Sequence, residues 1–446
     1  MAQALAHADD ATAAPPQQGG ALDRLRIVGG QRLNGAVRVS GAKNAALKHM
    51  CAALLADGAL RLTNVPTGLR DIASQTALLA HLGVRVDAQG ADMTLRVNRL
   101  TSHTAPYDLV RKMRGSILVL GPLLARFGRA RVSLPGGCAI GTRPVDLHLQ
   151  ALRALGANVL LENGYITATA PQKGLVGAKV VFPSASVGAT ENLLMAATLA
   201  KGETVIAGAA REPEIADLAA CLAAMGAVIE GAGTSTIRVQ GVPSLHGAMH
   251  RVMPDRIEAG TWMIAAAMAG GRVVLKDADT QHLAALTGLL AAAGVTPTPA
   301  TGGDLVVEAT GDRPQGVDIM TAPYPGFPTD LQAQFMALLA RADGAALVTE
   351  TIFENRFMHA PELVRMGADI RVQGNAAIVR GVPGLRGAPV MATDLRASVA
   401  LVLAGLVARG TTEVHRIYHL ERGYENIVEK LRALGAEVER VPGQFA

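Results

Sequence analysis

Two expected helix starts carry groups that could bind an anion. Lys43 lies in the segment SGAKNA, directly ahead of an apolar run that predicts a helix. The free amides and the dipole at a helix start favour negative charge, so Lys43 either completes an anion site or is a solvated lysine beside a cap. A second segment, FPSASVGAT, also runs into a helix. Ser186 or Thr190 could hold a phosphate there, but capping of the helix is the safer interpretation.

Cys138 and Asp330 are the candidates for proton transfer. Cys138 lies in the glycine-rich segment PGGCAIGTRPVD with Arg143 close by, and both features favour an exposed thiol with a lowered pKa. We therefore expect a mobile lid rather than an inert loop cysteine. Asp330 follows the segment TAPYPGFPT and precedes a helix. It is either an N-cap, which is the default for aspartate at that place, or a general base.

Six cations occur at corresponding places along the chain. Three of them begin or end elements in its second half, and the full set is Lys43, Arg114, Arg143, Arg356, Arg396 and Arg422. Surface salt bridges would explain any one of them. Their recurrence at the same stage of separate units favours one convergent anion site, because the arginine fork matches carboxylate and phosphate.

The composition limits the classes of function. Half of the residues are hydrophobic and 18% are charged, which excludes a disordered chain. The formal charge of +5 is not gathered into runs and only 3% of residues are aromatic, so neither a nucleic acid nor a membrane surface is an expected partner. The longest apolar run, residues 399–408, is well short of the ~20 residues that a membrane span needs.

Common catalytic and metal-binding motifs are absent from the sequence, including GxxxxGK[ST], HExxH and GxSxG. His415 and His419 lie near an expected strand end, so we expect no metal site. Cys51 and Cys221 lie in apolar helices as inert core residues, and three cysteines cannot form a disulfide framework. Residues 1–22 lack an apolar signal core and are predicted to be a flexible tail, so we expect a cytoplasmic protein.

A sixfold period organises the chain. Helix ends of the form Leu/Met/Ala-Gly-Ala/Val recur every 68 to 73 residues, at Gly83, Gly156, Gly226, Gly294, Gly367 and Gly435. Each unit contains an apolar helix, a strand, a second helix ended by the glycine and a hairpin, in a βαβαββ order. The apolar helices are expected at 44–56, 116–126, 190–200, 259–269, 331–341 and 395–408. This alternation predicts a mixed α/β fold.

The period also predicts two lobes of three units each. The sixth unit is truncated, and the two N-terminal strands, 24–28 and 36–40, have no unit of their own. We expect them to complete the last unit, which gives a first lobe over 43–253 with the Cys138 loop, and a second lobe of 254–446 together with 22–42. The space between two lobes is a usual place for a ligand, and a double crossing suits hinge closure.

Nine segments in order resemble the UDP-N-acetylglucosamine enolpyruvyl transferases (1-carboxyvinyltransferases), a branch of the enolpyruvyl transferase family. They are SGAKNAA at 40–46, PGGCAIG at 135–141, RPVDLH at 143–148, SVGAT at 186–190, PDRIE at 254–258, FPTDLQAQF at 327–335, FENRFMH at 353–359, DLRAS at 394–398 and RIYHLERGYE at 416–425. The resemblance runs from about residue 24 to residue 441. Any one motif is weak, but this many in order is highly specific.

The resemblance implies a fold and a reaction. The fold is an inside-out α/β barrel of two lobes, each with three βαβαββ units. The reaction transfers the enolpyruvyl group of phosphoenolpyruvate to the 3′-hydroxyl of UDP-N-acetylglucosamine and releases phosphate, as the first committed step of peptidoglycan synthesis. No metal or organic cofactor is implied, and the two partners are small molecules.

The resemblance also implies residue roles for phosphoenolpyruvate. Lys43, Arg143 and Arg422 would hold this substrate, with Arg356 and Arg396 supporting the site. A closed site without screening water makes such cations effective against polyanions.

The implied acceptor contacts come from several loops. They are Asn44 and Arg114 facing the sugar nucleotide, Pro144, Val145, Asp146 and Leu147 at the uracil, Ser186, Val187 and Gly188 at the diphosphate, and Ile352 at the sugar. Asp330 would take the 3′-hydroxyl proton as general base, and Cys138 would protonate the enolpyruvyl methylene as general acid. In the resembling family the antibiotic fosfomycin alkylates this cysteine, so sensitivity is expected here.

Three departures from the family pattern touch no residue with an implied role. They are Leu47-Lys-His49, Ala139 and Tyr324. Two rival functions remain: an enolpyruvylshikimate phosphate synthase, which shares fold and donor, and a catalytically silent protein that binds the sugar nucleotide. The Cys138 loop with Arg143 favours the uridine-sugar enzyme over the first. The presence of Lys43, Cys138, Asp330 and Arg422 argues against the second.

Overall fold

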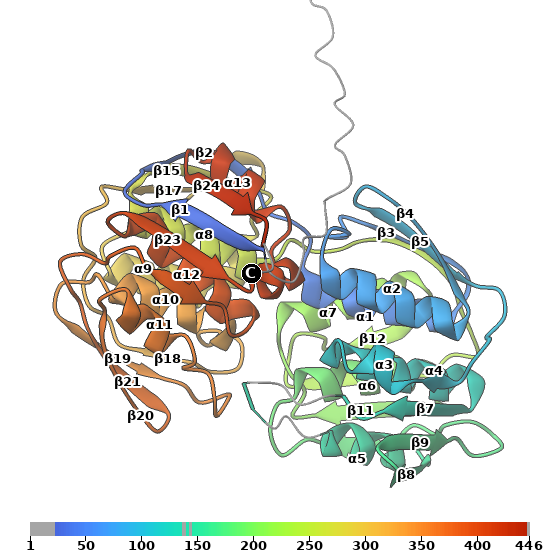
Figure 1. Cartoon of the computed structure of the whole chain (residues 1–446). Helices are drawn as coiled ribbons and strands as arrows, with labels where there is room; N and C mark the ends of the chain where they lie inside the picture. Colours follow the sequence, from blue (N-terminus) through green and yellow to red (C-terminus); the bar gives the residue numbers. More distant parts are fainter. Residues whose placement is uncertain (1–22, 136–139, 142–144, 444–446) are drawn as a thin grey trace, which may run out of the picture.

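The computed structural model describes residues 23–135, 140–141 and 145–443, and its elements recur in one order along the chain (Figure 1). From residue 43 to 251 they are α1 Lys43–Ala52, η1 Ala53–Leu55, β3 Ala56–Thr63, α2 Arg70–Leu82, β4 Val84–Gln89, β5 Asp92–Val97, β6 Thr104–Ala105, α3 Tyr107–Val110, η2 Arg114–Val119, α4 Leu120–Phe127, β7 Arg129–Ser133, α5 Asp146–Ala154, β8 Asn158–Glu162, β9 Tyr165–Thr169, β10 Lys179–Val181, α6 Val187–Ala197, β11 Glu203–Ala207, α7 Pro213–Ala224, β12 Val228–Glu230, β13 Thr236–Gln240 and β14 Leu245–Arg251.

The other elements repeat the same order. They are β1 Arg24–Val28, β2 Leu33–Arg38, α8 Arg256–Ala269, β15 Gly271–Lys276, η3 Thr280–Leu283, α9 Ala284–Ala292, β16 Thr298–Pro299, η4 Thr301–Gly303, β17 Leu305–Ala309, β18 Ile319–Met320, η5 Thr329–Leu331, α10 Gln332–Leu339, β19 Ala345–Thr349, α11 Ala360–Arg365, β20 Asp369–Gln373, β21 Ala376–Arg380, β22 Pro389–Met391, α12 Leu395–Val407, β23 Thr411–His415, η6 Ile417–Arg422, α13 Ile427–Ala433 and β24 Glu437–Val441. The predicted tail, residues 1–22, lies outside the described residues.

The strands of the described residues form six four-stranded sheets of one connectivity. In each sheet a parallel pair of strands is extended by two antiparallel strands. The strand orders are β14-β3-β5-β4, β6-β7-β9-β8, β10-β11-β13-β12, β2-β15-β17-β16, β18-β19-β21-β20 and β22-β23-β1-β24. The six glycines that mark the period all have φ between 88° and 103°, the left-handed conformation that ends a helix. The predicted sixfold mixed α/β order is confirmed.

The two N-terminal strands join different sheets, and one part of the prediction is therefore wrong. Strand β1 completes the last sheet, antiparallel to β24 with Arg24 opposite Val441, so the two ends of the described chain lie side by side. Strand β2 instead pairs in parallel with β15, in the fourth sheet. Strand β14 likewise crosses back to pair with β3 in the first sheet. The period locates helix ends, which are local, whereas strand pairing depends on contacts between distant segments.

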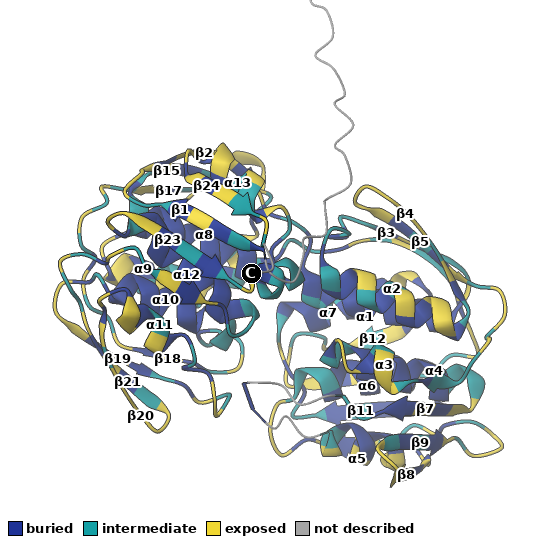
Figure 2. Ribbon diagram, viewed as in Figure 1, coloured by how far each residue is buried: buried dark blue, intermediate teal, exposed yellow. Residues whose placement is uncertain are grey.

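Helices lie inside and sheets outside, the reverse of an ordinary barrel (Figure 2). Helices α8, α10 and α12 pack on one another, and α4 packs on α6. Small residues allow this close packing. At Gly121 a Cβ atom would lie 2.5 Å from the carbonyl oxygen of Asn192 on α6, so only glycine fits between these helices. The alanine-rich, aromatic-poor composition follows from the same requirement.

Among the described residues, nearly all buried apolar side chains belong to one of two separate clusters. One covers residues 42–252, and the other covers 25–39 together with 257–438. Figure 1 shows two corresponding bodies joined near the centre of the view. The division into lobes at about residues 42 and 253 stays a proposal, and this separation of the cores supports it. No helix among the described residues has the length and apolar character to cross a membrane.

Candidate active site

Asp330 lies between two buried arginines. It belongs to η5, at the start of α10, and its two carboxylate oxygens accept hydrogen bonds from Arg356 Nη2 (2.9 Å) and Arg396 Nη2 (3.1 Å). Burial works against its ionisation, but the two arginines outweigh burial and hold the pKa of Asp330 far below its usual range. Asp330 makes no side-chain cap, so the default N-cap interpretation is wrong. The N-cap of η5 is Pro328, and a proline side chain cannot accept a hydrogen bond from a backbone amide.

Arg396 is fixed from several sides. It is the second residue of α12, whose N-cap Asp394 accepts hydrogen bonds from the amides of residues 396 and 397. Its guanidinium lies 5.5 Å from the centre of the Tyr424 ring. The Tyr424 hydroxyl is hydrogen-bonded to Thr261 at 2.9 Å and accepts a hydrogen bond from Gln334 at 3.2 Å. Gln334 also donates to the carbonyl oxygen of Asp330 at 2.8 Å, so one network orients both partners of the ion pair.

A second carboxylate, Asp71, joins Lys43 and Arg422. It lies in the first turn of α2, 2.9 Å from Lys43 Nζ and 2.8 Å from Arg422 Nε. Lys43 is the first residue of α1 and Arg422 the last of η6, so this contact joins the two proposed lobes. Lys43 is buried, which makes the interpretation as a solvated lysine wrong. Asp71 was not singled out from the sequence. An acidic residue in the first turn of a helix is common, because its negative charge interacts favourably with the helix dipole.

The two groups form one electrostatic site. Burial lowers the pKa of Lys43 against the attraction of Asp71, and the charges of Arg396 and Arg422 lower it further. Lys43 in turn contributes to the lowered pKa of Asp330. Four cations and two carboxylates leave a net charge of 4 − 2 = +2, held largely out of water. Three of the cations are buried, so the surface salt-bridge interpretation is wrong for Lys43, Arg356 and Arg396.

Other predicted residues meet at the starts of α5 and α6. Ser186 caps α6, accepting a hydrogen bond from the Ala189 amide at 3.4 Å, as the safer interpretation predicted. A Cβ atom added at Gly188 would lie 3.2 Å from the His148 ring. The charges of Arg114 and Asp146 both act on that ring. His148 was not singled out from the sequence, since a single histidine in an amphipathic helix gives no signal of its own.

Several predicted residues flank these groups, and three are not described. Val145, Leu147, Val187 and Asn44 are partly exposed at the starts of α5, α6 and α1. Cys138, Arg143 and Pro144 lie outside the described residues, so their expected roles stay predictions. At the described end of their loop, the Ile140 carbonyl accepts a hydrogen bond from the amide of Asn355, next to Arg356.

Ile352 is held close to Asp330 by a shared carboxylate. The side chain of Glu350 accepts hydrogen bonds from the Ile352 amide at 2.8 Å and from the Thr329 hydroxyl at 2.9 Å. Thr329 directly precedes Asp330 in η5. The proposed sugar contact and the proposed base therefore belong to one hydrogen-bonded unit.

Two buried histidines near the site should make the protein lose stability in mild acid. Burial, aided by Arg114, lowers the pKa of His148 to about 4, and burial also lowers that of His359 to about 4. Asn192 donates to His148 Nδ1 at 3.1 Å, because its oxygen already accepts from the Gly121 amide, so a proton on Nδ1 would break this bond. Between pH 6.5 and about 4 these histidines are protonated in the unfolded chain but not in the folded chain. The free energy of unfolding therefore falls as the pH falls, by at most about 3 kcal/mol per histidine.

Urea unfolding measured from pH 7.5 to pH 4.5 tests this expectation. His148→Gln should flatten the dependence of unfolding free energy on pH, and substitution of the exposed His81 by glutamine should leave it unchanged. An unaltered dependence in His148→Gln would contradict the assignment.

The comparisons with known proteins identify the family. A sequence model of EPSP synthase (3-phosphoshikimate 1-carboxyvinyltransferase) matches residues 27–431, most of the chain. The chain belongs to the EPSP synthase family. The enolpyruvyl transferase resemblance inferred from the nine motifs is thereby confirmed, and so is the expectation of an enzyme with the inside-out barrel of this family.

Two relatives with high sequence identity to this chain bear the name of one activity. The UDP-N-acetylglucosamine 1-carboxyvinyltransferase of Acidiphilium cryptum is 60% identical over 420 residues, which cover 94% of this chain and 100% of that protein. The protein of the same name from Rhodospirillum centenum is 58% identical over 430 residues, covering 94% and 99%.

Solved structures of the EPSP synthase family share the fold. The enolpyruvyl transferase NikO from Streptomyces tendae superposes with a TM-score of 0.86 at 28% identity, covering 95% of this chain and 100% of that chain. An EPSP synthase from Acinetobacter baumannii has a TM-score of 0.72 at 19% identity, covering 94% and 100%, and this likeness shows the fold alone.

Proposed function

We propose that this protein transfers the enolpyruvyl group of phosphoenolpyruvate to the 3′-hydroxyl of UDP-N-acetylglucosamine. The observation that carries the proposal is the cluster of four cations around two carboxylates, Lys43, Arg356, Arg396 and Arg422 with Asp71 and Asp330. Relatives at 58–60% identity that bear the name of this activity supply the choice of acceptor. The reaction is the first committed step of peptidoglycan synthesis. Because both substrates are phosphorylated metabolites made in the cytoplasm, we place it there.

Phosphoenolpyruvate would enter as a replacement for the protein's own carboxylates. Its carboxylate and phosphate match the two anions that Asp71 and Asp330 now present to the cations. Lys43, Arg422 and the arginine at 143 would hold it, with Arg356 and Arg396 alongside. In a site screened from water these charges also stabilise the phosphate as it leaves.

Binding of phosphoenolpyruvate would convert Asp330 into a base. While Arg356 and Arg396 pair with Asp330, its pKa is too low for it to accept a proton. A substrate anion that engages these arginines would reduce their pull on Asp330 and raise its pKa. Asp330 would then take the proton of the 3′-hydroxyl, so the base becomes active only when the donor is present.

The reaction would proceed by addition and elimination. The acceptor oxygen forms a bond to C2 of phosphoenolpyruvate, its proton passes to Asp330, and Cys138 protonates C3. The resulting tetrahedral ketal would then return a proton from C3 to the Cys138 thiolate while the C2–O bond to phosphate breaks and the proton held by Asp330 leaves with the phosphate, which restores the double bond and both catalytic groups. No cofactor enters this balance.

The acceptor would lie along the starts of α5 and α6. The free amides of α6, at Ser186, Val187 and Gly188, suit a diphosphate. Residues 144–147 would contact the uracil, Arg114 and Asn44 the sugar nucleotide, and Ile352 the sugar near Asp330.

One cysteine should account for the thiol reactivity of the folded enzyme. Cys51 and Cys221 are buried, and burial raises the pKa of both thiols. An epoxide such as fosfomycin should therefore attach once per chain, at Cys138, and abolish transfer. Mass spectrometry of the labelled protein and of a Cys138→Ser control locates the adduct. Full activity after stoichiometric labelling of Cys138 would overturn its role.

The acceptor is tested by phosphate release from phosphoenolpyruvate. We expect release with UDP-N-acetylglucosamine and none with shikimate 3-phosphate. Release with shikimate 3-phosphate alone would reassign the acceptor. Binding of the sugar nucleotide without any release would indicate a catalytically silent protein.

A further inference from the structure

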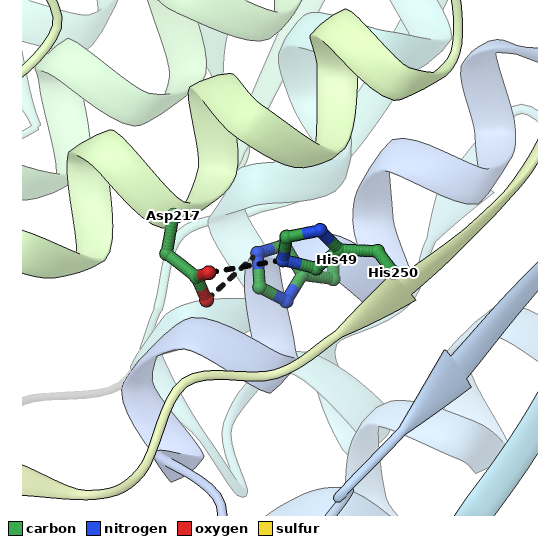
Figure 3. Close-up of side chains that lie close together, drawn as sticks. All are labelled: His49, Asp217 and His250. Atoms are coloured by element: carbon green, nitrogen blue, oxygen red, sulfur yellow. Dashed lines mark hydrogen bonds and ion pairs between the residues drawn. The ribbon is translucent and has the colours of Figure 1, made fainter. Parts of the chain in front are cut away.

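Three side chains from three elements lie close together beside α1 (Figure 3). His49 comes from α1, Asp217 from α7 and His250 from β14. His49 Nε2 lies 3.4 Å from Asp217 Oδ2, and His250 Nε2 lies 3.0 Å from Asp217 Oδ1. One ligand atom from each residue lies within 4.8 Å of the other two. The transferase reaction uses none of these residues.

The burial of His49 makes this cluster unusual. Its side chain is fully buried, and neither ring nitrogen has a hydrogen-bond partner among the described residues. The contact with Asp217 is close, but it is not aligned as a hydrogen bond. A buried polar group without a partner is costly, and this one is aimed at a carboxylate and a second imidazole.

The pKa shifts of His49 and Asp217 agree with the geometry of the cluster. Burial lowers the pKa of His49 to about 4, so its imidazole is neutral at neutral pH. Burial opposes ionisation of Asp217, but the hydrogen bond with His250 and the interactions with both imidazoles outweigh burial and lower its pKa, so it stays a carboxylate. Metals require neutral imidazole and ionised carboxylate.

We propose that His49, Asp217 and His250 bind a divalent transition-metal ion, for which Zn²⁺ is the best match. Two imidazole nitrogens and one carboxylate oxygen form a common zinc ligand set, with water in the fourth position. Tetrahedral coordination with metal–ligand bonds of about 2.0 Å needs ligand atoms about 3.3 Å apart. The two histidine nitrogens already lie 3.4 Å and 3.0 Å from Asp217, each from a different oxygen of the carboxylate. Metal binding would require the imidazoles and the carboxylate to rotate until one ligand atom from each faces the same point, because these atoms now lie within 4.8 Å of one another.

The position of the site suggests a structural role. Asp217 Oδ2 also accepts a hydrogen bond from the Met253 amide at 3.2 Å, and the Met253 carbonyl accepts one from Ala42. Ala42 and Met253 lie at the two chain crossings between the proposed lobes, and Lys43 begins α1 next to Ala42. A metal ion here would tie α1, α7 and β14 together beside these crossings.

Zinc titration of the full-length, untagged, metal-free protein tests the proposal. We expect one Zn²⁺ per chain, measured by calorimetry and by elemental analysis after dialysis. Co²⁺ in the same site should give the intense visible absorption of a tetrahedral ion, and Zn²⁺ should displace it. His250→Ala and Asp217→Asn should each weaken binding by at least about 100-fold, since even groups behind a ligand contribute 10- to 100-fold.

His246→Ala is the matched control. His246 lies on the same strand, β14, but is exposed, and its Nδ1 is hydrogen-bonded to the carbonyl oxygen of Gly247. Zinc should raise the unfolding temperature of the wild type and of His246→Ala, and not that of His250→Ala. Failure of the wild type to bind Zn²⁺ stoichiometrically would overturn the proposal, even if a variant did not fold. Equal binding by wild type, His250→Ala and Asp217→Asn would overturn it as well.

Discussion

Asp330→Asn should lower kcat for enolpyruvyl transfer by about 100- to 10,000-fold, the usual contribution of a positioned general base. The amide keeps the size of the side chain and can still accept a hydrogen bond from an arginine, but it cannot take a proton. The KM for phosphoenolpyruvate should not rise, because removing the carboxylate raises the net charge of the cluster from +2 to +3. A loss confined to kcat would therefore separate a missing base from a damaged binding site.

The stability of Asp330→Asn provides an internal check. Arg356 and Arg396 are left buried without a counterion, which lowers the unfolding temperature of the unliganded protein. Phosphoenolpyruvate should restore more of this loss in the variant than it adds to the wild type, because it supplies the missing anion. Asp343→Asn, an exposed aspartate of the same half of the chain, is the control. Undiminished kcat in Asp330→Asn would remove it from the mechanism.

Lys43→Met should lower kcat/KM by roughly 100- to 1,000-fold, equivalent to about 2.7–4 kcal/mol of transition-state stabilisation. Methionine fills a similar volume, so the start of α1 should keep its shape while the charge next to Asp71 and Arg422 is lost. Asp71 would then be neutralised by Arg422 alone. The cation set that we assign to phosphoenolpyruvate would lose one of its buried charges.

Lys48→Met is the matched control for Lys43→Met. Lys48 lies on the same helix, is equally buried and also pairs with a carboxylate, Glu191, at 3.3 Å. Burial raises the pKa of Glu191 to about 7, so this acid can bind a proton once its partner is gone. We expect both variants to lose stability and only Lys43→Met to lose activity. Similar activity losses in the two would mean that buried charge on α1, rather than the site, sets the rate.

Local patterns in the sequence predicted much of the fold. The six recurring glycines mark helix ends because they adopt a left-handed backbone conformation, which residues with a Cβ atom rarely adopt. Runs of small apolar residues mark the inner helices because those helices are buried all round. The partners of β2 and β14 were not predictable in this way. Each crosses to a sheet of another unit, and no local feature of either strand encodes its partner.

The candidate site likewise contains residues that a sequence pattern could reveal and residues that only the fold could reveal. Its cations could be singled out because they recur at the same stage of separate units. Asp71 could not, since its role depends on Arg422, 351 residues away, which only the fold brings within 2.8 Å. The pairing of Asp330 with two arginines was also beyond the sequence, which offered only the choice between a cap and a base. His49 and His250 have no shared pattern at all, because they come from a helix and a strand about two hundred residues apart.

The identity of the product tests the central claim most directly. Purified protein is incubated with phosphoenolpyruvate and UDP-N-acetylglucosamine, and the sugar nucleotide is recovered for mass spectrometry and NMR. We predict that it gains an enolpyruvyl group in ether linkage at the 3′-oxygen, with one phosphate released per product formed. Recovery of the unchanged sugar nucleotide under conditions in which both substrates bind would contradict the account.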